Sequence, residues 1–100
     1  VRDVRVSRPV GGYLVALAEA TRSHPDLALG MSPRGTLMLF RASRALAFLR
    51  GRDHVLPDDA KFLAGSVMSH RLVLAPKARH SGRTGAEIVK EIIGRVPVPA

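Results

Sequence analysis

One hundred residues suit a single domain, and 46% apolar residues are enough to form a buried core. Cysteine is absent, which excludes a disulfide framework, a thiolate zinc site and a thiol nucleophile. Lys and Arg together number 16 against 8 Asp and Glu, so the net charge is +8 and an anionic partner becomes a reasonable hypothesis.

The chain contains no apolar run near the ~18–20 residues that cross a bilayer. Its first residues, Val1 to Val6, also lack the apolar centre of a signal peptide. We therefore expect a cytoplasmic protein without a membrane partner. The first residue is not Met, which indicates a fragment of a longer protein.

The first predicted helix runs from about Pro9 to Arg22, because proline fits the first turn of a helix. Its apolar residues recur at the spacing of one buried face: Val10, Tyr13, Leu14, Leu17 and Ala18. Pro25 ends this helix, since the residue before a proline avoids the helical region. Residues 23–31 are then expected to form a linker.

The clearest helix start is at Ser32, which is a good N-cap and is followed by Pro33 as the first helical residue. This helix is expected to end at Arg50, with Gly51 as its left-handed cap. Its predicted buried stripe is formed by Leu39, Ala42, Leu46 and Leu49, and is widened by Leu37, Phe40 and Phe48. We therefore expect this helix to be central and buried on more than one side.

A third helix is predicted to start at Pro57-Asp58-Asp59, where an aspartate serves as N-cap and faces the positive end of the helix dipole. Its buried stripe is predicted to be Ala60, Leu63, Ala64, Val67 and Met68. Residues 52–56 before it favour a short extended segment. Residues 71–76 after it fit either a frayed helix end or an extended segment.

The basic stretch from Lys77 to Arg83 has no apolar periodicity and is predicted to be an exposed loop. Thr84 and Glu87 have the spacing of a capping box and begin the last helix. Its predicted inner face is formed by Ile88, Val89, Ile92, Ile93 and Val96, with Glu91 and Arg95 as an outer ion pair. The fold class is therefore all-α: a small four-helix bundle with room for one short strand pair.

Catalytic and metal-binding motifs are not found. The four histidines, His24, His54, His70 and His80, lie in separate segments without metal-ligand spacing, so no metal site is expected. Asp58 and Asp59 are explained by the helix start, and the sequence lacks a phosphate-binding loop and a nucleophile elbow. This chain alone is therefore not expected to be an enzyme.

Arg34 is the candidate binding residue. It lies in the first turn of a capped helix, where an arginine is unfavourable by itself and a phosphate would be well placed. The alternative is a solvated arginine. Arg41 lies two turns further along nearly the same face, and either extends a basic stripe or is solvated.

Two other functions fit the charge: a free-standing module that binds DNA or RNA, and a protein-interaction domain without nucleotide contact. The helix over residues 33–50 is apolar over most of its surface, which leaves few positions for base contacts. One Tyr and three Phe, which mostly fit core stripes, also argue against single-strand stacking. Nucleic-acid binding therefore stays an alternative, and so does a protein-interaction domain.

Four ordered segments resemble the C-terminal lid of MoxR-family AAA+ ATPases: Thr21–Pro25, Gly30–Gly35, Gly51–Asp59 and His70–Leu74. The family patterns there are approximately T-R-x-H-P, G-A-S-P-R-A, G-R-D-Y-V-x-P-D-D-V-K and H-R-L-x-L. The resemblance covers residues 6–99. The departures are Met31 and Gly35 in place of alanines, His54 in place of tyrosine, and Lys77 where an acidic residue is common.

The resemblance implies that residues 1–8 are a linker from a missing ATPase core and that residues 9–100 are the lid. It implies that Arg34 is the sensor-2 residue, which reaches the terminal phosphates of ATP, with Ser32 and Pro33 beside it in the motif. ATP and Mg²⁺ would be cofactors of the full-length protein, and the fragment alone would hold neither.

The resemblance also implies partners. The lid would contact its own ATPase core and neighbouring subunits in a ring, usually a hexamer. Such rings are chaperone-like ATPases, often with a von Willebrand factor A-domain protein as partner. The lid would move with the nucleotide state of the core.

Overall fold

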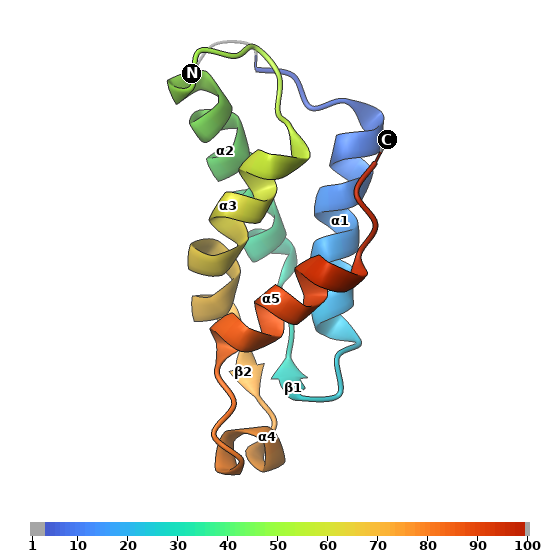
Figure 1. Cartoon of the computed structure of the whole chain (residues 1–100), viewed down its shortest axis with the longest axis vertical. Coiled ribbons are helices and arrows are strands. Elements are labelled where there is room, and N and C mark those ends of the chain that lie inside the picture. Colours follow the sequence, from blue (N-terminus) through green and yellow to red (C-terminus); the bar gives the residue numbers. More distant parts are fainter. Residues whose placement is uncertain (1–3, 100) are drawn as a thin grey trace.

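The structure, a computed structural model, describes residues 4–99 and consists of helices with one short antiparallel strand pair (Figure 1). Its elements, in chain order, are α1 (Arg8–Arg22), β1 (Leu27–Leu29), α2 (Pro33–Leu49), α3 (Pro57–Met68), the 3₁₀ turn η1 (Ser69–Arg71), β2 (Val73–Leu74), α4 (Pro76–His80) and α5 (Gly85–Arg95). The predicted fold class is confirmed: four longer helices form the bundle, and one strand pair accompanies them. The described helices are not long and apolar enough for any of them to cross a membrane.

The domain is elongated, with extents of 44 × 24 × 20 Å. In Figure 1, α2 and α3 lie on one side, α1 lies on the other, and α5 crosses between them. The apolar stripe predicted for α1 is entirely buried, and Ile88, Val89 and Ile92 of α5 pack into the same core. The core therefore runs along the bundle where α1, α3 and α5 meet α2.

The predicted burial of α2 is wrong in part. Its buried residues form one narrow stripe at every fourth position: Gly35, Leu39, Ser43 and Ala47. Three residues expected inside are exposed, namely Leu37, Phe48 and Leu49, and Leu49 is 79% exposed. The small residues of the stripe allow close packing of one ridge of α2. Among residues 4–99, no element covers the other apolar side.

Side chains cap the helices as predicted at two of the starts. The hydroxyl of Ser32 accepts a hydrogen bond from the Gly35 N–H at 3.0 Å, and Thr84 with Glu87 forms the capping box of α5. The predicted start of α3 at Pro57 is correct, but the predicted aspartate N-cap is wrong, because Leu56 is the N-cap residue. Asp59 is the third helical residue, and its carboxylate accepts the Leu56 N–H at 2.8 Å.

The loop predicted over Lys77–Arg83 is partly helical, since Pro76–His80 form α4. Ala78 of this turn is buried although the surrounding side chains are exposed, and the Arg83 N–H donates to its carbonyl at 3.1 Å. One buried alanine in a basic stretch leaves too little apolar pattern to reveal so short a helix.

The two strands pair Leu27 with Leu74 and Leu29 with Val73.

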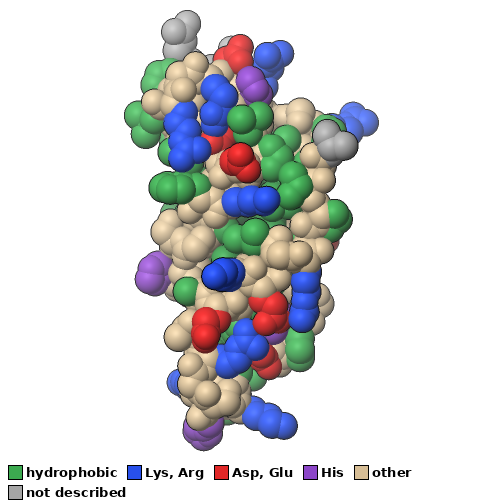
Figure 2. Space-filling view, in the orientation of Figure 1, with side chains coloured by type: hydrophobic (Ala, Val, Ile, Leu, Met, Phe, Trp, Pro, Cys, Tyr) green, Lys and Arg blue, Asp and Glu red, His purple; other side chains and the backbone are tan. Residues whose placement is uncertain are grey.

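An ionic network joins the end of α1 to α5. The buried ring of His24 contacts Glu91 through Nε2 at 2.9 Å, and its Nδ1 accepts the Asp26 N–H at 3.0 Å. Arg83 donates to both Glu91 and Asp26, at 2.9 and 3.1 Å. Because Nδ1 is an acceptor, Nε2 carries the proton and donates to Glu91. Figure 2 shows acidic and basic side chains side by side at this end of the domain.

The segment before α1 also packs on the domain. Arg5 forms a parallel bridge with the loop before α3: its N–H donates to Asp53 and its carbonyl accepts from Val55, both at 2.9 Å. The Arg44 side chain donates to the Val4 carbonyl at 3.0 Å. A second small core joins Val4, Val10, Ala47 and Val55. Residues 1–3 of the predicted linker lie outside the described residues, and its boundary at residue 8 stays a prediction.

Candidate anion-binding site

The loop before α2 is fixed to the end of α1 through one peptide group on each side of Met31. The Met31 N–H donates to the buried Thr21 hydroxyl at 2.7 Å, and the Met31 carbonyl accepts from Arg22 Nε at 2.9 Å. Arg22 also donates to the Thr36 hydroxyl at 3.2 Å. These bonds set the position of the first turn of α2 relative to α1.

Gly30 makes this close approach possible. A Cβ atom at this position would lie 2.6 Å from the carbonyl carbon of Thr21 and 2.7 Å from the Arg22 nitrogen. Backbone atoms cannot move aside as the end of a side chain can, so a larger residue here would separate the loop from α1. Thr21-Arg22 and Gly30 lie in two of the segments that resemble the family, and the structure shows that these segments contact each other.

Arg34 is an exposed residue in the first turn of α2, directly after Ser32 and Pro33. The three predicted site residues are therefore together, and Arg34 projects from a helix whose start is capped. Among residues 4–99, no side chain or carbonyl forms a hydrogen bond or ion pair with the Arg34 guanidinium, and the same is true of Arg41.

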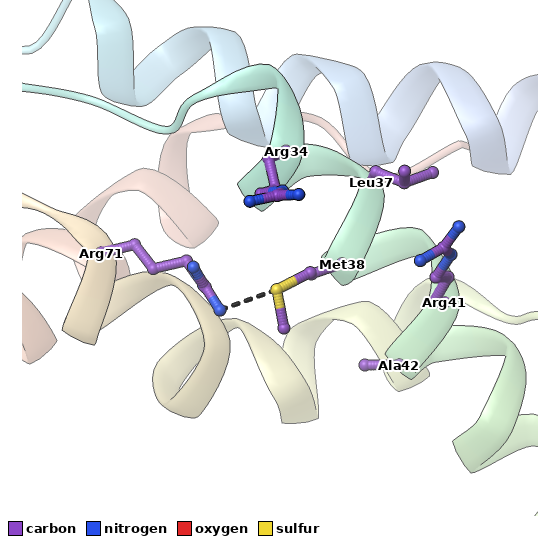
Figure 3. A pocket seen from close by; sticks show the side chains of 6 residues that line it. All are labelled: Arg34, Leu37, Met38, Arg41, Ala42 and Arg71. Atoms are coloured by element: carbon purple, nitrogen blue, oxygen red, sulfur yellow. Dashed lines mark hydrogen bonds between the residues drawn. The ribbon is translucent and has the colours of Figure 1, made fainter.

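A shallow hollow of about 840 Å³ lies beside Arg34 on the outer side of α2. Figure 3 shows its lining: three arginines around an apolar floor, with Arg34 and Arg41 from α2 and Arg71 from η1. The floor is formed by Leu37, Met38 and Ala42. No Asp or Glu lines this hollow, so the positive charges face an open surface without compensation.

A second hollow of about 550 Å³ adjoins the first, and Arg71 lines both. Its other lining residues come from the end of α1, the end of β1, the loop before α2 and η1: Arg22, Leu29, Gly30, Met31, Ser32 and His70. This hollow also has no carboxylate in its lining. The positive surface therefore extends from Arg41 to the loop that Arg22 holds.

Other arginines have carboxylate partners and serve the fold. The fully buried Asp59 carboxylate accepts from Arg50 at 3.2 Å and from Arg52. Burial alone would raise the pKa of Asp59, but the hydrogen bonds from Arg52 and Leu56 and the charges of Arg52 and Arg50 lower it below its usual value. Arg50 also lies over the Phe62 ring, 5.0 Å from its centroid. The Gly51–Asp59 motif thus has a structural role: its buried ion pair holds the connection between α2 and α3.

Sequence reasoning missed two parts of this picture. The sequence explains Asp59 by the helix start alone, although it is also the acceptor for Arg50 and Arg52. The sequence does not place Arg71 beside Arg34, because 37 positions separate the two and no local pattern links them. The motif that contains Arg71 was visible in the sequence, but its place beside α2 appears only in the fold.

The remaining candidates do not gather into a site. His54, His70 and His80 are exposed in different segments, and His24 is in the ionic network. Within residues 4–99, no three His, Asp or Glu side chains form a group that could hold a metal ion. Asp58 is exposed, whereas Asp59 is buried and pairs with arginines, so the two are not a matched carboxylate pair.

The family model described as "AAA lid domain" matches residues 19–92 of this chain. This range begins near the end of α1 and includes the loop, α2, Arg71 and most of α5. The hollow and the elements that form it therefore lie within the matched region.

Three comparisons with individual proteins agree with this match. The chain is 41% identical to the uncharacterized protein YeaC of Bacillus subtilis, covering 99% of this chain and 31% of that protein. It is also 41% identical to protein MoxR of Paracoccus denitrificans, over 88% of this chain and 30% of the relative. A crystal structure of a presumed ATPase from Cytophaga hutchinsonii superposes with a TM-score of 0.92 at 29% identity, covering 98% of this chain and 32% of the other. The chain thus spans less than a third of each of these proteins.

Proposed function

Because this chain belongs to the AAA lid domain family, we propose that it is the lid of a MoxR-like AAA+ ATPase in which Arg34 contacts the terminal phosphates of bound ATP. The observation that carries the role of Arg34 is its place: exposed, in a capped first helical turn, beside a hollow lined by arginines. A guanidinium there can donate two parallel hydrogen bonds to phosphate oxygens.

Domain motion follows from the same placement. Hydrolysis and phosphate release remove negative charge from the region that Arg34 would contact, so its attraction changes with the nucleotide state. Arg34 belongs to the first turn of α2, and the bonds around Met31 fix that turn to α1. A force on this arginine would therefore move the bundle as one body.

The ATPase core would supply what this chain lacks. We propose that ATP and Mg²⁺ are held chiefly by residues outside this chain, and that the lid contacts its own core and the next subunit of a ring. The outward apolar side chains of α2 and α3, such as Leu49 and Phe62, are suited to such contacts, since they are 79% and 67% exposed. A von Willebrand factor A-domain protein stays a proposed partner of the ring.

The test is Arg34→Ala in the longer ATPase that contains this lid, compared with Arg79→Ala as a control of equal charge. Arg79 is exposed on α4 and lines neither hollow. Arg34→Ala should lower ATP turnover about tenfold or more, because a charge-assisted hydrogen bond is lost. The thermal midpoint should remain unchanged. Turnover equal to that of the Arg79→Ala protein would overturn the role of Arg34.

A further inference from the structure

Arg71 crosses the first turn of α2 although it belongs to a different element. An added Cβ at the buried Gly35 would lie only 3.3 Å from Cδ of Arg71, so the absence of a side chain at Gly35 leaves the space that the Arg71 stem occupies. Packing at this contact directs the guanidinium toward the hollow beside Arg34, as Figure 3 shows. The two arginines therefore line one space from two elements.

The guanidinium of Arg71 has only a weak acceptor in this structure. It donates to the thioether sulfur of Met38 at 2.7 Å, and no carboxylate among residues 4–99 pairs with it. A thioether is a poor acceptor, whereas an anionic oxygen forms a charge-assisted bond about twice as strong as a neutral one. An anion that enters the hollow can therefore replace Met38 as the hydrogen-bond acceptor of Arg71.

The charge around the hollow favours an anion with several charged groups. Arg34, Arg41 and Arg71 line it together, and their mutual repulsion is not offset by any acidic side chain in the lining. A single phosphate can neutralise only part of this positive charge. A chain of linked phosphates can extend from one guanidinium to the next.

We propose that Arg71 is a second phosphate-binding arginine, which binds the same polyphosphate chain as Arg34 from the end of α3. The inference rests on the proposed function, because it places the ligand of Arg34 in this hollow. Its consequence is that the phosphate chain connects the start of α2 with η1, which directly follows α3. Nucleotide binding would then add a contact between these two elements, and loss of the terminal phosphate would weaken that contact.

The first experiment titrates the 100-residue chain with inorganic tripolyphosphate and, separately, with inorganic phosphate, following the arginine Nε–H signals by NMR. The chain should bind tripolyphosphate at least tenfold more tightly than phosphate. Arg71→Gln keeps much of the stem that packs on Gly35 but removes the charge, and should weaken tripolyphosphate binding about fivefold. Arg34→Gln should have a similar effect. The matched control Arg79→Gln should change binding less than twofold, because salt screens its distant charge.

The second experiment separates this inference from the proposed function in the longer ATPase. Arg71→Gln should raise the KM for ATP or lower turnover by about fivefold or more relative to Arg79→Gln, with an unchanged thermal midpoint. If Arg34→Gln impairs the enzyme while Arg71→Gln behaves like the control, the inference about Arg71 is overturned and the proposed function stands. If Arg34→Gln also behaves like the control, the proposed function fails and the inference fails with it.

Discussion

Two groups of arginines in this domain differ in what surrounds them. Arg50 and Arg52 converge on the buried Asp59, and Arg83 bonds to Glu91 and Asp26 at the opposite end of the bundle. The second group, which lines the hollow beside α2, has no carboxylate partner among the described residues: Arg34, Arg41 and Arg71. The net charge of +8 is therefore not one uniform property. Part of the arginine charge is neutralised within the fold, and another part faces the open hollow.

The comparison predicts the largest effect at Asp59. Replacing Asp59 with Ala should destabilise the fold by about 3 kcal/mol, because it leaves two arginines and the Leu56 N–H without their acceptor. This value is at the low end for buried ion pairs, since both arginines keep some contact with solvent. Urea denaturation measures it. Asp58→Ala, on the same helical turn but exposed, should cost less than about 1 kcal/mol, and an equal loss from both variants would contradict the distinction.

Glu91 should make stability depend on pH. Hydrogen bonds from Arg83 and His24, together with the charges of Arg83 and Arg95, lower the pKa of Glu91 from 4.5 to about 2, against a smaller opposing effect of burial. A carboxyl whose pKa is lowered by folding adds stability above its unfolded pKa, and this stability is lost as the pH falls toward the folded value. The Glu91 contribution is thus complete above about pH 5 and declines between pH 4.5 and 2.

The variant Glu91→Gln tests this pH window. At pH 7, its thermal midpoint should be below that of the unchanged chain. This decrease should be smaller than the decrease caused by Asp59→Ala, because Glu91 is partly exposed. The difference between the two proteins should shrink as the pH falls from 4.5 toward 2. A difference that stays constant over this range would show that the carboxylate charge of Glu91 is not what stabilises the network.

Arg22 stands between the two groups, because its partners are a carbonyl and a hydroxyl. Arg22→Ala should destabilise the fold by about 1 kcal/mol, the usual net value of such hydrogen bonds. It should also loosen the loop before α2, which faster amide exchange at Met31 would reveal. Slow exchange retained at Met31 would mean that Thr21 alone holds the loop.

The smallest effect is expected for Arg41, a member of the unpaired group. Arg41→Ala should change the free energy of unfolding by no more than about 0.5 kcal/mol, since no partner among the described residues is lost. The sign should be slightly stabilising at low salt, because repulsion from Arg34 and Arg71 decreases, and should vanish at high salt. A clear destabilisation would place Arg41 among the structural arginines.

The sequence allowed the elements to be predicted where local rules decide them. The apolar spacing of α1 and α5, the serine cap of α2 and the capping box at Thr84 all depend on residues within a few positions of one another. The burial of α2 was predicted less well. Its apolar residues surround the helix, and periodicity cannot tell which of them face this domain and which, like Leu49, face outward.

Site residues show the same division. Ser32, Pro33 and Arg34 are adjacent, so the start of α2 could be predicted from one short motif. The contacts of Asp59 and Arg71 depend on chain segments that only folding brings together, and for Arg71 the contacted residue, Gly35, is 36 positions away. An arginine in a motif can belong either to the paired group or to the group beside the hollow. Its neighbours in space, rather than in sequence, decide which.

The bridge between Arg5 and the loop before α3 determines how the domain takes up tension. A pull on Val4 first loads the hydrogen bonds to Asp53, Val55 and Arg44, and only then the Ser7 cap of α1. The two Arg5 bonds belong to a single bridge, so a load along the chain would be shared between them. A load along residues 4–7 would therefore reach α2 and the loop before α3 before it reaches the first turn of α1.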